Sequence, residues 1–364
     1  MPKQIPGRNL VLRTAIALLS LNALVALARD RSKQPPEPQP QITAPQIDLP
    51  DGRKLLYERS FASEREVKLK RGFWTKVLDL VAGAPELHNL VRPYGVAADS
   101  RGRVIVTDPG IPAVHIFDFD RQKYKLIHRA GKQELRSPQC VAVDAQDDFY
   151  VTDSDAGMIF IFDNNGDYRR TIGALKGGEG MFKRPTGIAI DSEAQRIYVS
   201  DTWRQQIFVL DMNGSVLQKI GKGGAAPGEF NFPTELRFDD GELLVVDAMN
   251  FRVQALQPSG EASVLTGRAG DGSADMFRPK GIGLDSEHNI YVVDGLKDLV
   301  QVFNHQGQLL YYFGGSGTGP EEFQLPAGLF INHDDRIYVV DSYNRRIQVL
   351  RYIGSRQQAQ GGGL

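Results

Sequence analysis

The sequence predicts an all-β protein, a six-bladed β-propeller of four-stranded antiparallel blades. The main observation is one motif that recurs six times at a spacing of 45 to 48 residues. Each copy reads Pro, a short aliphatic run, Asp, a polar turn, a β-branched run ending in a second Asp, and a third apolar run. The copies begin at Pro93, Pro138, Pro185, Pro233, Pro279 and Pro326. A fixed period of this length is typical of repeat architectures.

The third copy shows how the four strands of one blade are predicted. Apolar residues alternate through 187–210 in three short segments separated by turn residues, which is the pattern of half-buried strands. Asn213-Gly214 is a two-residue hairpin signal, and a fourth strand is expected at 216–220. A Gly-rich loop then leads to the next Pro. Each copy therefore predicts an antiparallel meander of four strands.

The ends of the repeat region suggest how the ring closes. The chain reaches only the third strand of the sixth copy, at 347–352, and no fourth strand follows. Before the first copy, Trp74 to Gly83 resembles an isolated fourth strand. We expect this N-terminal strand to complete the last blade and to close the propeller.

The N-terminus predicts export. Lys3, Arg8 and Arg13 precede an apolar run from Ala15 to Ala28. These are the parts of a secretory signal peptide, and the run is shorter than the roughly 20 residues that span a bilayer. Basic residues after the run leave an uncleaved membrane tether through residues 14–28 as the alternative. A periplasmic or extracellular location is expected in either case.

Composition divides the chain into four parts. Residues 1–28 are the signal peptide or membrane anchor, and the Pro- and Gln-rich segment 29–53 is predicted to be a linker. The propeller is expected over 54–354, and a flexible tail over 355–364. The formal net charge of −1 provides no overall field for nucleic acid. The single cysteine, Cys140, excludes a disulfide framework.

The repeat resembles a known family at this level of detail. The series Pro-x-Gly-Ile-Ala-x-Asp, Ile-Tyr-Val-x-Asp and Asn-x-Arg-Ile-Gln-Val is similar to the NHL repeat, and 184–210 and 325–350 are the nearest copies. The resemblance covers about residues 74 to 354. It implies a propeller whose ligands bind on the face formed by the second-to-third turns and the inter-blade loops. It does not imply one function, because such propellers serve as binding modules, lyases and sensors.

The resemblance also supplies a test for an enzyme. NHL-like amidating lyases hold zinc with histidines that commonly follow the strand-initial Pro, and a catalytic zinc needs three converging protein ligands. Here the positions after Pro are Tyr94, Gln139, Thr186, Thr234, Lys280 and Ala327. We therefore assign no catalytic residue, no metal and no cofactor. A propeller lyase or hydrolase with a metal in the channel, peptidyl-hydroxyglycine lyase-like or lactonase-like, is the alternative function.

The recurring acidic residues are expected to have structural roles. Asp99, Asp144, Asp191, Asp239 and Asp285, with Asn332, end the first strands. Asp108, Asp153, Asp201, Asp247, Asp294 and Asp341 end the second strands. Asp and Asn begin turns by bonding their own backbone, so recurrence in every blade favours turn formation over metal binding.

Departures from the motif are the candidates for function. Blade 4 has Glu235 and Arg237 where other blades have small or apolar residues. Two such charges on a crowded inner strand are expected to form an internal salt bridge or to contact ligand at the channel mouth.

The predicted ligand face carries arginines and large apolar residues, which are usual anchors of interfaces. The candidate ligand-binding residues are Arg92, Tyr94, Arg136, Arg184, Trp203, Arg204, Glu235, Arg237, Met249, Arg278 and Tyr343. We expect a binding or scaffold module for a protein, peptide or glycan, and no nucleic-acid binding.

Overall fold

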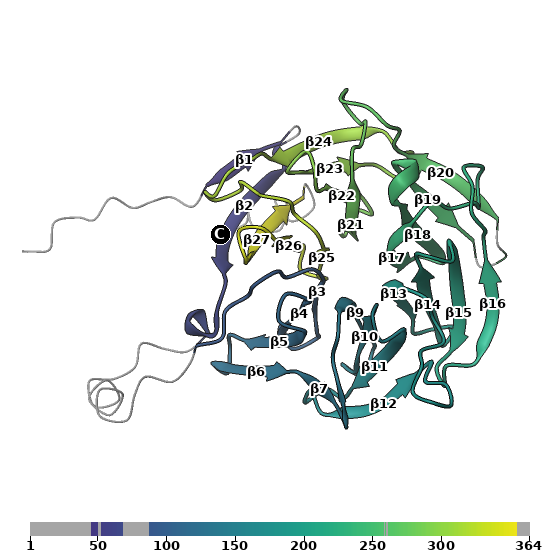
Figure 1. Ribbon diagram of the computed structural model, residues 1–364. Coiled ribbons are helices and arrows are strands. Elements are labelled where there is room, and N and C mark those ends of the chain that lie inside the picture. The colour runs from purple at the N-terminus through teal and green to yellow at the C-terminus, as the bar shows by residue number, and fades with distance from the viewer. Residues whose placement is uncertain (1–44, 50–51, 68–86, 258, 260, 355–364) are drawn as a thin grey trace, which may run out of the picture. The chain divides into compact units, whose positions relative to one another are not determined.

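The computed structural model describes residues 45–49, 52–67, 87–257, 259 and 261–354. Within these residues the chain forms six antiparallel sheets around a common axis (Figure 1). Each sheet is one blade, and the innermost strand of every blade contacts the innermost strands of both neighbours. The predicted six-bladed propeller is therefore confirmed.

Blades 1 to 5 each have four strands that follow the chain from the axis outward. Blade 1 contains β3 (Val96–Ala98), β4 (Val104–Asp108), β5 (Ala113–Asp118) and β6 (Lys123–Ile127). Blade 2 contains β9 (Pro138–Val143), β10 (Phe149–Asp153), β11 (Met158–Phe162) and β12 (Tyr168–Ile172). Blade 3 contains β13 (Pro185–Asp191), β14 (Arg196–Asp201), β15 (Gln206–Asp211) and β16 (Val216–Ile220). Blade 4 contains β17 (Pro233–Asp239), β18 (Glu242–Asp247), β19 (Arg252–Leu256) and β20 (Ala262–Thr266). Blade 5 contains β21 (Pro279–Leu284), β22 (Ile290–Asp294), β23 (Leu299–Phe303) and β24 (Leu309–Gly314).

The sixth blade joins the two ends of the propeller. Its first three strands are β25 (Leu329–Ile331), β26 (Arg336–Asp341) and β27 (Arg346–Ile353). The N-terminal strands β2 (Lys54–Phe61) and β1 (Gln46–Asp48) add a fourth and a fifth strand. The antiparallel register places Lys54 opposite Ile353. Closure by an N-terminal strand is thus confirmed (Figure 1).

The strand predicted to close the ring was the wrong one. Trp74 to Gly83 lies outside the described residues, and β2 occupies the edge of β27 that this segment was expected to fill. β1 also falls inside the predicted linker 29–53. The apolar positions of β2, Leu55 and Phe61, are buried, but they are only two. Two apolar positions are a weak strand signal, and the Pro- and Gln-rich segment just before them favoured the prediction of a linker.

Short elements complete the described chain. A small hairpin, β7 (Arg129–Ala130) and β8 (Gln133–Glu134), connects blades 1 and 2. Two 3-10 turns are present, η2 (Glu64–Glu66) and η3 (Ala248–Asn250). None of the helices in the described part of the chain has the length and apolar character needed to cross a lipid bilayer.

The core is divided into six apolar clusters, and each one lies between two neighbouring blades. The cluster between blades 2 and 3, for example, combines Tyr150 and Ile159 with Val199 and Phe208. The cluster between blades 5 and 6 includes Leu55 of β2. The N-terminal strand is therefore part of the core as well as of the sheet.

A buried aspartate ends the second strand of every blade and holds the loop that enters that blade. In blade 3 the carboxylate of Asp201 accepts hydrogen bonds from the backbone N–H groups of Lys183 (2.8 Å) and Arg184 (3.0 Å), just before Pro185. The backbone N–H groups of the loop bond the equivalent aspartate in the other five blades. In blade 1, burial opposes ionisation of Asp108, yet the His115 ring, whose Nε2 lies 3.7 Å from the carboxylate, and hydrogen bonds from the backbone of Val91 and Arg92 lower its pKa. The structural role predicted for this set is confirmed.

Blades 4 and 6 reinforce this arrangement with an arginine. In blade 4, Arg252 lies 2.9 Å from Asp247 and donates to the carbonyls of Ala225, Ala226 and Glu229 in the Gly-rich loop. Arg346 of blade 6 makes the same set of contacts with Asp341 and its own loop. The Asn-x-Arg part of the motif therefore fixes loop position rather than binding ligand.

The acidic residues that end the first strands also begin turns, with one exception. Asp99 accepts hydrogen bonds from the backbone of Arg101 and Arg103. Corresponding bonds form at Asp144, Asp191, Asp285 and Asn332. Asp239 instead lies 2.8 Å from the Nδ1 of His288 in blade 5. The turn after Asp239 is short, so it leaves no backbone N–H in the usual position.

Leu55→Ala is expected to lower the free energy of unfolding by about 2–4 kcal/mol, because the side chain is fully buried in the core of the closing blade. Equilibrium unfolding in urea measures this loss. Leu217→Ala, at an exposed position of β16, is the matched control. Equal stability of wild type and Leu55→Ala would show that β2 does not close the ring.

Asp201→Asn is expected to cost about 1–3 kcal/mol. The amide keeps the shape of the side chain, but its NH2 group faces a backbone N–H where a carboxylate oxygen accepted a bond. Thermal unfolding of this variant against Asp240→Asn, an exposed aspartate at a turn, isolates the effect. A loss no larger than that of the control would contradict the role of Asp201.

Candidate functional site: the loop face and the channel mouth

One side of the propeller consists of the loops that lead into each strand-initial proline and of the turns between second and third strands. We call this side the loop face. The two sets lie together because each buried aspartate bonds both of them: Asp201 accepts from Arg184 N–H before the proline and from Arg204 N–H in the turn. This is the face on which the sequence predicts a ligand.

Exposed apolar side chains are concentrated on the loop face. Fourteen large apolar side chains are exposed among the described residues. Nine of them lie on this face: Val91, Leu175, Trp203, Phe232, Met249, Phe277, Leu296, Leu325 and Tyr343. Tyr343 and Trp203 are the most exposed of these, at 68% and 59%. The remaining five lie on the outer strands β12, β16, β20 and β24.

Within the described part of the chain, the side chains of four arginines of the loop face form no ion pair and no hydrogen bond. They are Arg92, Arg136, Arg184 and Arg278, whose backbone N–H groups are nevertheless held by the buried aspartates. The guanidinium of Arg184 lies over the Trp203 ring, 5.3 Å from its centroid. Arg204 differs from them, because it pairs with Asp201 at 3.2 Å and donates to the carbonyl of Met181 at 2.8 Å. Its guanidinium is therefore already engaged in structure.

The channel mouth is formed where the inner strands begin. Tyr94 is half-buried there and packs against two of the apolar clusters. Its hydroxyl forms no hydrogen bond with another described residue. Burial raises the pKa of Tyr94, with contributions from Cys140 and Glu235, while Arg278 and Arg184 oppose the shift. Tyr94 thus lies among groups from four other blades.

Lys280 also lies at the channel mouth, although it is not among the site residues predicted from the sequence. It is half-buried, and no ion pair or hydrogen bond joins its ammonium to another described residue. Its stem lies beside Gly295, where an added Cβ would come within 3.0 Å of its Cε. Burial, followed by the positive charges of Arg278 and Arg92, lowers the pKa of Lys280 to about 8, and Asp298 opposes the shift. The only signal in the sequence is a cation in the position after Pro, where the other blades have uncharged residues.

Glu235 bonds a cysteine rather than Arg237. Its carboxylate is buried and accepts a hydrogen bond from the Sγ of Cys140 in blade 2 at 3.0 Å. Burial raises the pKa of Glu235, and the bond from Cys140 and the charge of Arg237 oppose the rise. No ion pair joins Glu235 to Arg237, although both residues are described. The predicted direct salt bridge is therefore wrong.

Glycine explains why Cys140 and Glu235 meet. They occupy the second position after Pro, which is glycine in the other four blades. In blade 3, between them, a Cβ on Gly187 would lie 2.1 Å from the carbonyl oxygen of Thr234. The inner strands approach one another so closely that four blades have glycine, and therefore no side chain, at this position. The side chains of Cys140 and Glu235 occupy the space that the neighbouring glycines leave open.

Arg237 lies deeper in the channel, away from the loop face. Its guanidinium donates to the carbonyls of Ile282 and Leu329, both at 3.2 Å, and lies 5.2 Å from the centroid of the Phe330 ring. It thereby ties the inner strand of blade 4 to those of blades 5 and 6. It also lines a cavity of about 300 Å³ with Phe238 and the turns at the opposite end. The expectation that Arg237 reaches the ligand face is not met.

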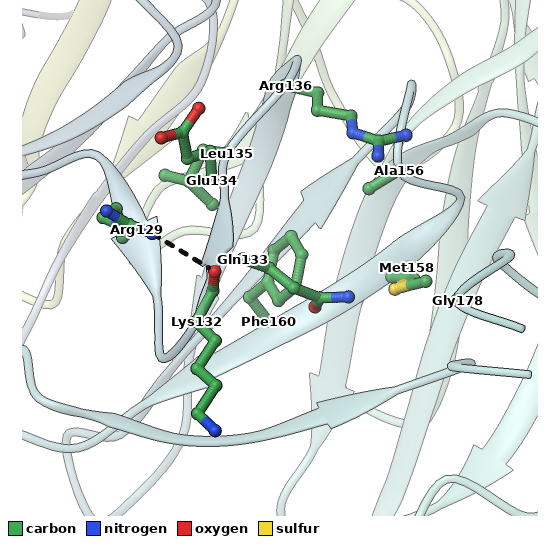
Figure 2. A pocket seen from close by; sticks show the side chains of 10 residues that line it. All are labelled: Arg129, Lys132, Gln133, Glu134, Leu135, Arg136, Ala156, Met158, Phe160 and Gly178. Carbon is green, nitrogen blue, oxygen red and sulfur yellow. Dashed lines mark hydrogen bonds between the residues drawn. The ribbon is translucent and has the colours of Figure 1, made fainter.

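A second cavity, of about 330 Å³, lies near the outer edge of the loop face. Figure 2 shows it between the β7–β8 hairpin and Ala156, Met158 and Phe160 of blade 2. Its lining includes Arg136.

The described histidines do not form a group of three, although the rings of His288 and His305 lie 6.0 Å apart. His115 is buried and bonds Tyr124 at 2.8 Å, His288 bonds Asp239, and His88 lies 3.7 Å from Glu64. Among the residues that the structure describes, no group of three or more His, Cys, Asp or Glu side chains could hold a metal ion.

Lys280→Met is expected to stabilise the protein at pH 7, by on the order of 1–2 kcal/mol after allowance for solvent screening. The folded state lowers the pKa of Lys280 from 10.5 to about 8, so the unfolded chain binds this proton more tightly and protonation favours unfolding. The gain is complete below about pH 8 and disappears toward pH 10.5. Urea unfolding at pH 7 and pH 10 measures it, with the exposed Lys176→Met as control. A variant less stable than wild type at pH 7 would contradict this.

Solved structures with similar folds have different roles. A streptogramin B lyase is 14% identical, with a TM-score of 0.54 and coverage of 72% of this chain and 94% of that one. A Bacteroides thetaiotaomicron protein of unknown function is 15% identical, with a TM-score of 0.58 and coverage of 85% and 77%. An auxiliary nutrient binding protein from the same organism is 13% identical, with a TM-score of 0.57 and coverage of 72% and 70%. At these identities the likeness concerns the fold alone.

Sequence comparison supports the same architecture. No curated protein matches the chain significantly. The finer resemblance to NHL repeats stays a prediction. The model of the family DUF5128, described as 6-bladed beta-propeller, matches residues 134–201, 192–257 and 283–352, together more than half of the sequence. The chain therefore belongs to this family of six-bladed β-propellers.

Proposed function

We propose that this propeller is a non-catalytic binding module that holds a protein, peptide or glycan ligand on its loop face. The observation that carries the proposal is the concentration of exposed aromatic and aliphatic side chains beside unpaired arginines on that face. Contiguous apolar surface rimmed by polar groups marks interaction sites. Tyr, Trp and Arg are the residue types that supply most binding energy at interfaces.

The turns define the extent of the proposed binding surface. The second residue after the buried aspartate is large and apolar in four consecutive blades: Trp203, Met249, Leu296 and Tyr343. In blades 1 and 2 the same position holds Gly110 and Asp155. The surface therefore forms an arc over blades 3 to 6. An extended ligand such as a peptide segment or an oligosaccharide suits an arc of this kind.

An enzymatic function is less well supported. A streptogramin B lyase and a nutrient binding protein share this fold, so the fold does not choose between them. A metal-dependent lyase or hydrolase reaction needs converging ligands, and the described residues offer no such group. No arrangement of described side chains favours the lyase or hydrolase alternative.

The proposal includes export of the chain. Its support is the basic, then apolar, then Ala-x-Ala pattern of residues 1–28, which precedes the Pro- and Gln-rich segment. A propeller presented outside the cytoplasm, cleaved or tethered through residues 14–28, would meet extracellular or periplasmic ligands.

Tyr343→Ala and Trp203→Ala are each expected to weaken ligand binding about tenfold or more, because both remove large exposed anchors. Arrays of immobilised peptides and oligosaccharides identify ligands of the wild type, and calorimetry then compares the variants. Tyr312→Ala, at a 61% exposed tyrosine on the outer strand β24, is the matched control. Ligands that bind both loop-face variants as tightly as the control, or that are chemically converted, would refute the proposal.

A further inference from the structure

Three cationic side chains at the channel mouth have no ion-pair partner among the described residues. Lys280 and Arg278 come from the start of blade 5, and Arg92 comes from blade 1, across the start of blade 6. The residue between them in blade 6 is the small, buried Ala327. None of the three cationic side chains forms an ion pair or hydrogen bond with a described residue. By contrast, Arg103, Arg252 and Arg346 are each paired with a carboxylate.

The nearby carboxylates are already occupied. Asp298, the one acidic group that acts on Lys280, accepts hydrogen bonds from Ser316 Oγ (2.5 Å) and from the backbone of Leu325 (2.7 Å). Asp294 accepts from the backbone N–H groups of Phe277 and Arg278. Glu235 is bonded by Cys140. None of these three carboxylates forms an ion pair with Lys280, Arg278 or Arg92.

A half-buried ammonium without a partner is unfavourable for stability, because burial removes water without supplying an opposite charge. Residues that cost stability in this way are often retained for binding or catalysis. Two further polar groups at the mouth lack partners among the described residues, the hydroxyl of Tyr94 and the buried hydroxyl of Thr234. All of these groups can donate a hydrogen bond.

From this arrangement we propose that the channel mouth is a binding site for an oxyanion, a carboxylate or phosphate group of the ligand, held by Lys280, Arg278 and Arg92 with the Tyr94 hydroxyl. Arginine forks bind both groups through paired hydrogen bonds, and lysine adds a point charge. The inference rests on the proposed function, in which the rest of the ligand lies on the apolar arc. The oxyanion would set the position of the ligand on the disc, and the arc would supply contact area.

The test uses the full chain at pH 7 and constant ionic strength. Thermal unfolding and calorimetry are followed with sodium glucuronate as the carboxylate probe and inorganic phosphate as the phosphate probe. Sodium chloride and glucose serve as anionic and neutral controls. We expect at least one oxyanion to raise the melting temperature of the wild type above both controls, and the two probes show which oxyanion the site prefers. Oxyanion binding should weaken above about pH 8, because Lys280 then loses its proton. The groups that face Lys280 are Arg278 and Arg92, which lower its pKa, and Asp298, which raises it.

The variants decide whether the effect comes from this site. Lys280→Met and Arg278→Met should each weaken oxyanion binding about tenfold or more, whereas Lys176→Met, at an exposed cation in the loop between blades 2 and 3, should not. Lys280→Met is expected to be more stable than wild type without ligand, so a loss of binding is not a loss of folding.

Equal oxyanion binding by Lys280→Met and wild type would overturn the inference, and so would shifts no larger than those with chloride. Either result leaves the loop-face proposal intact, because Trp203 and Tyr343 test that surface separately. Failure of the Trp203 and Tyr343 variants to affect ligand binding, with a normal oxyanion response, would instead reject the arc alone.

Discussion

The hydrogen bonds between a buried aspartate and the backbone before each proline are the interaction on which the propeller depends. One carboxylate at the end of a second strand accepts N–H groups from the loop that brings the chain back to the axis. The loop's N–H groups would otherwise be buried without partners, and such groups are costly. Six repetitions of the bond place six prolines, and therefore six inner strands, at one level around the channel. The position of the loop face and of the channel mouth follows from this single constraint.

The cationic side chains fall into two groups: those that bond the loops of the fold and those that form no such bond. Arginines in the Asn-x-Arg part of the motif are used to hold loops, as Arg252 and Arg346 show. Arg204 and Arg237, although they depart from the repeat, also bond carbonyl groups of the fold. The side chains of Arg92, Arg184, Arg278 and Lys280 form no ion pair or hydrogen bond with other described residues. A ligand would therefore meet these cations rather than the ones that the fold has already neutralised.

The repeat made most of the architecture predictable from sequence. Its period set the number of blades, its alternation set the strands, and recurrence of Asp in every copy indicated turn formation. The closing strand was not predictable in the same way, since β2 pairs with a strand nearly 300 residues later and carries only two buried apolar positions, Leu55 and Phe61. Glu235 and Arg237 were recognisable as departures, but their partners were not. Glu235 is bonded by Cys140, and Arg237 bonds carbonyls in blades 5 and 6.

By itself the sequence determined the number of blades, the order of strands and the face on which loops and turns meet, because these depend on local spacing that is repeated six times. The tertiary structure decided which charges are neutralised, because the ring brings together residues from blades far apart in the chain. Lys280 illustrates the difference. In the sequence it is one residue after one proline, and only in the closed ring does it lie near Arg278 and Arg92 without forming an ion pair with a described carboxylate.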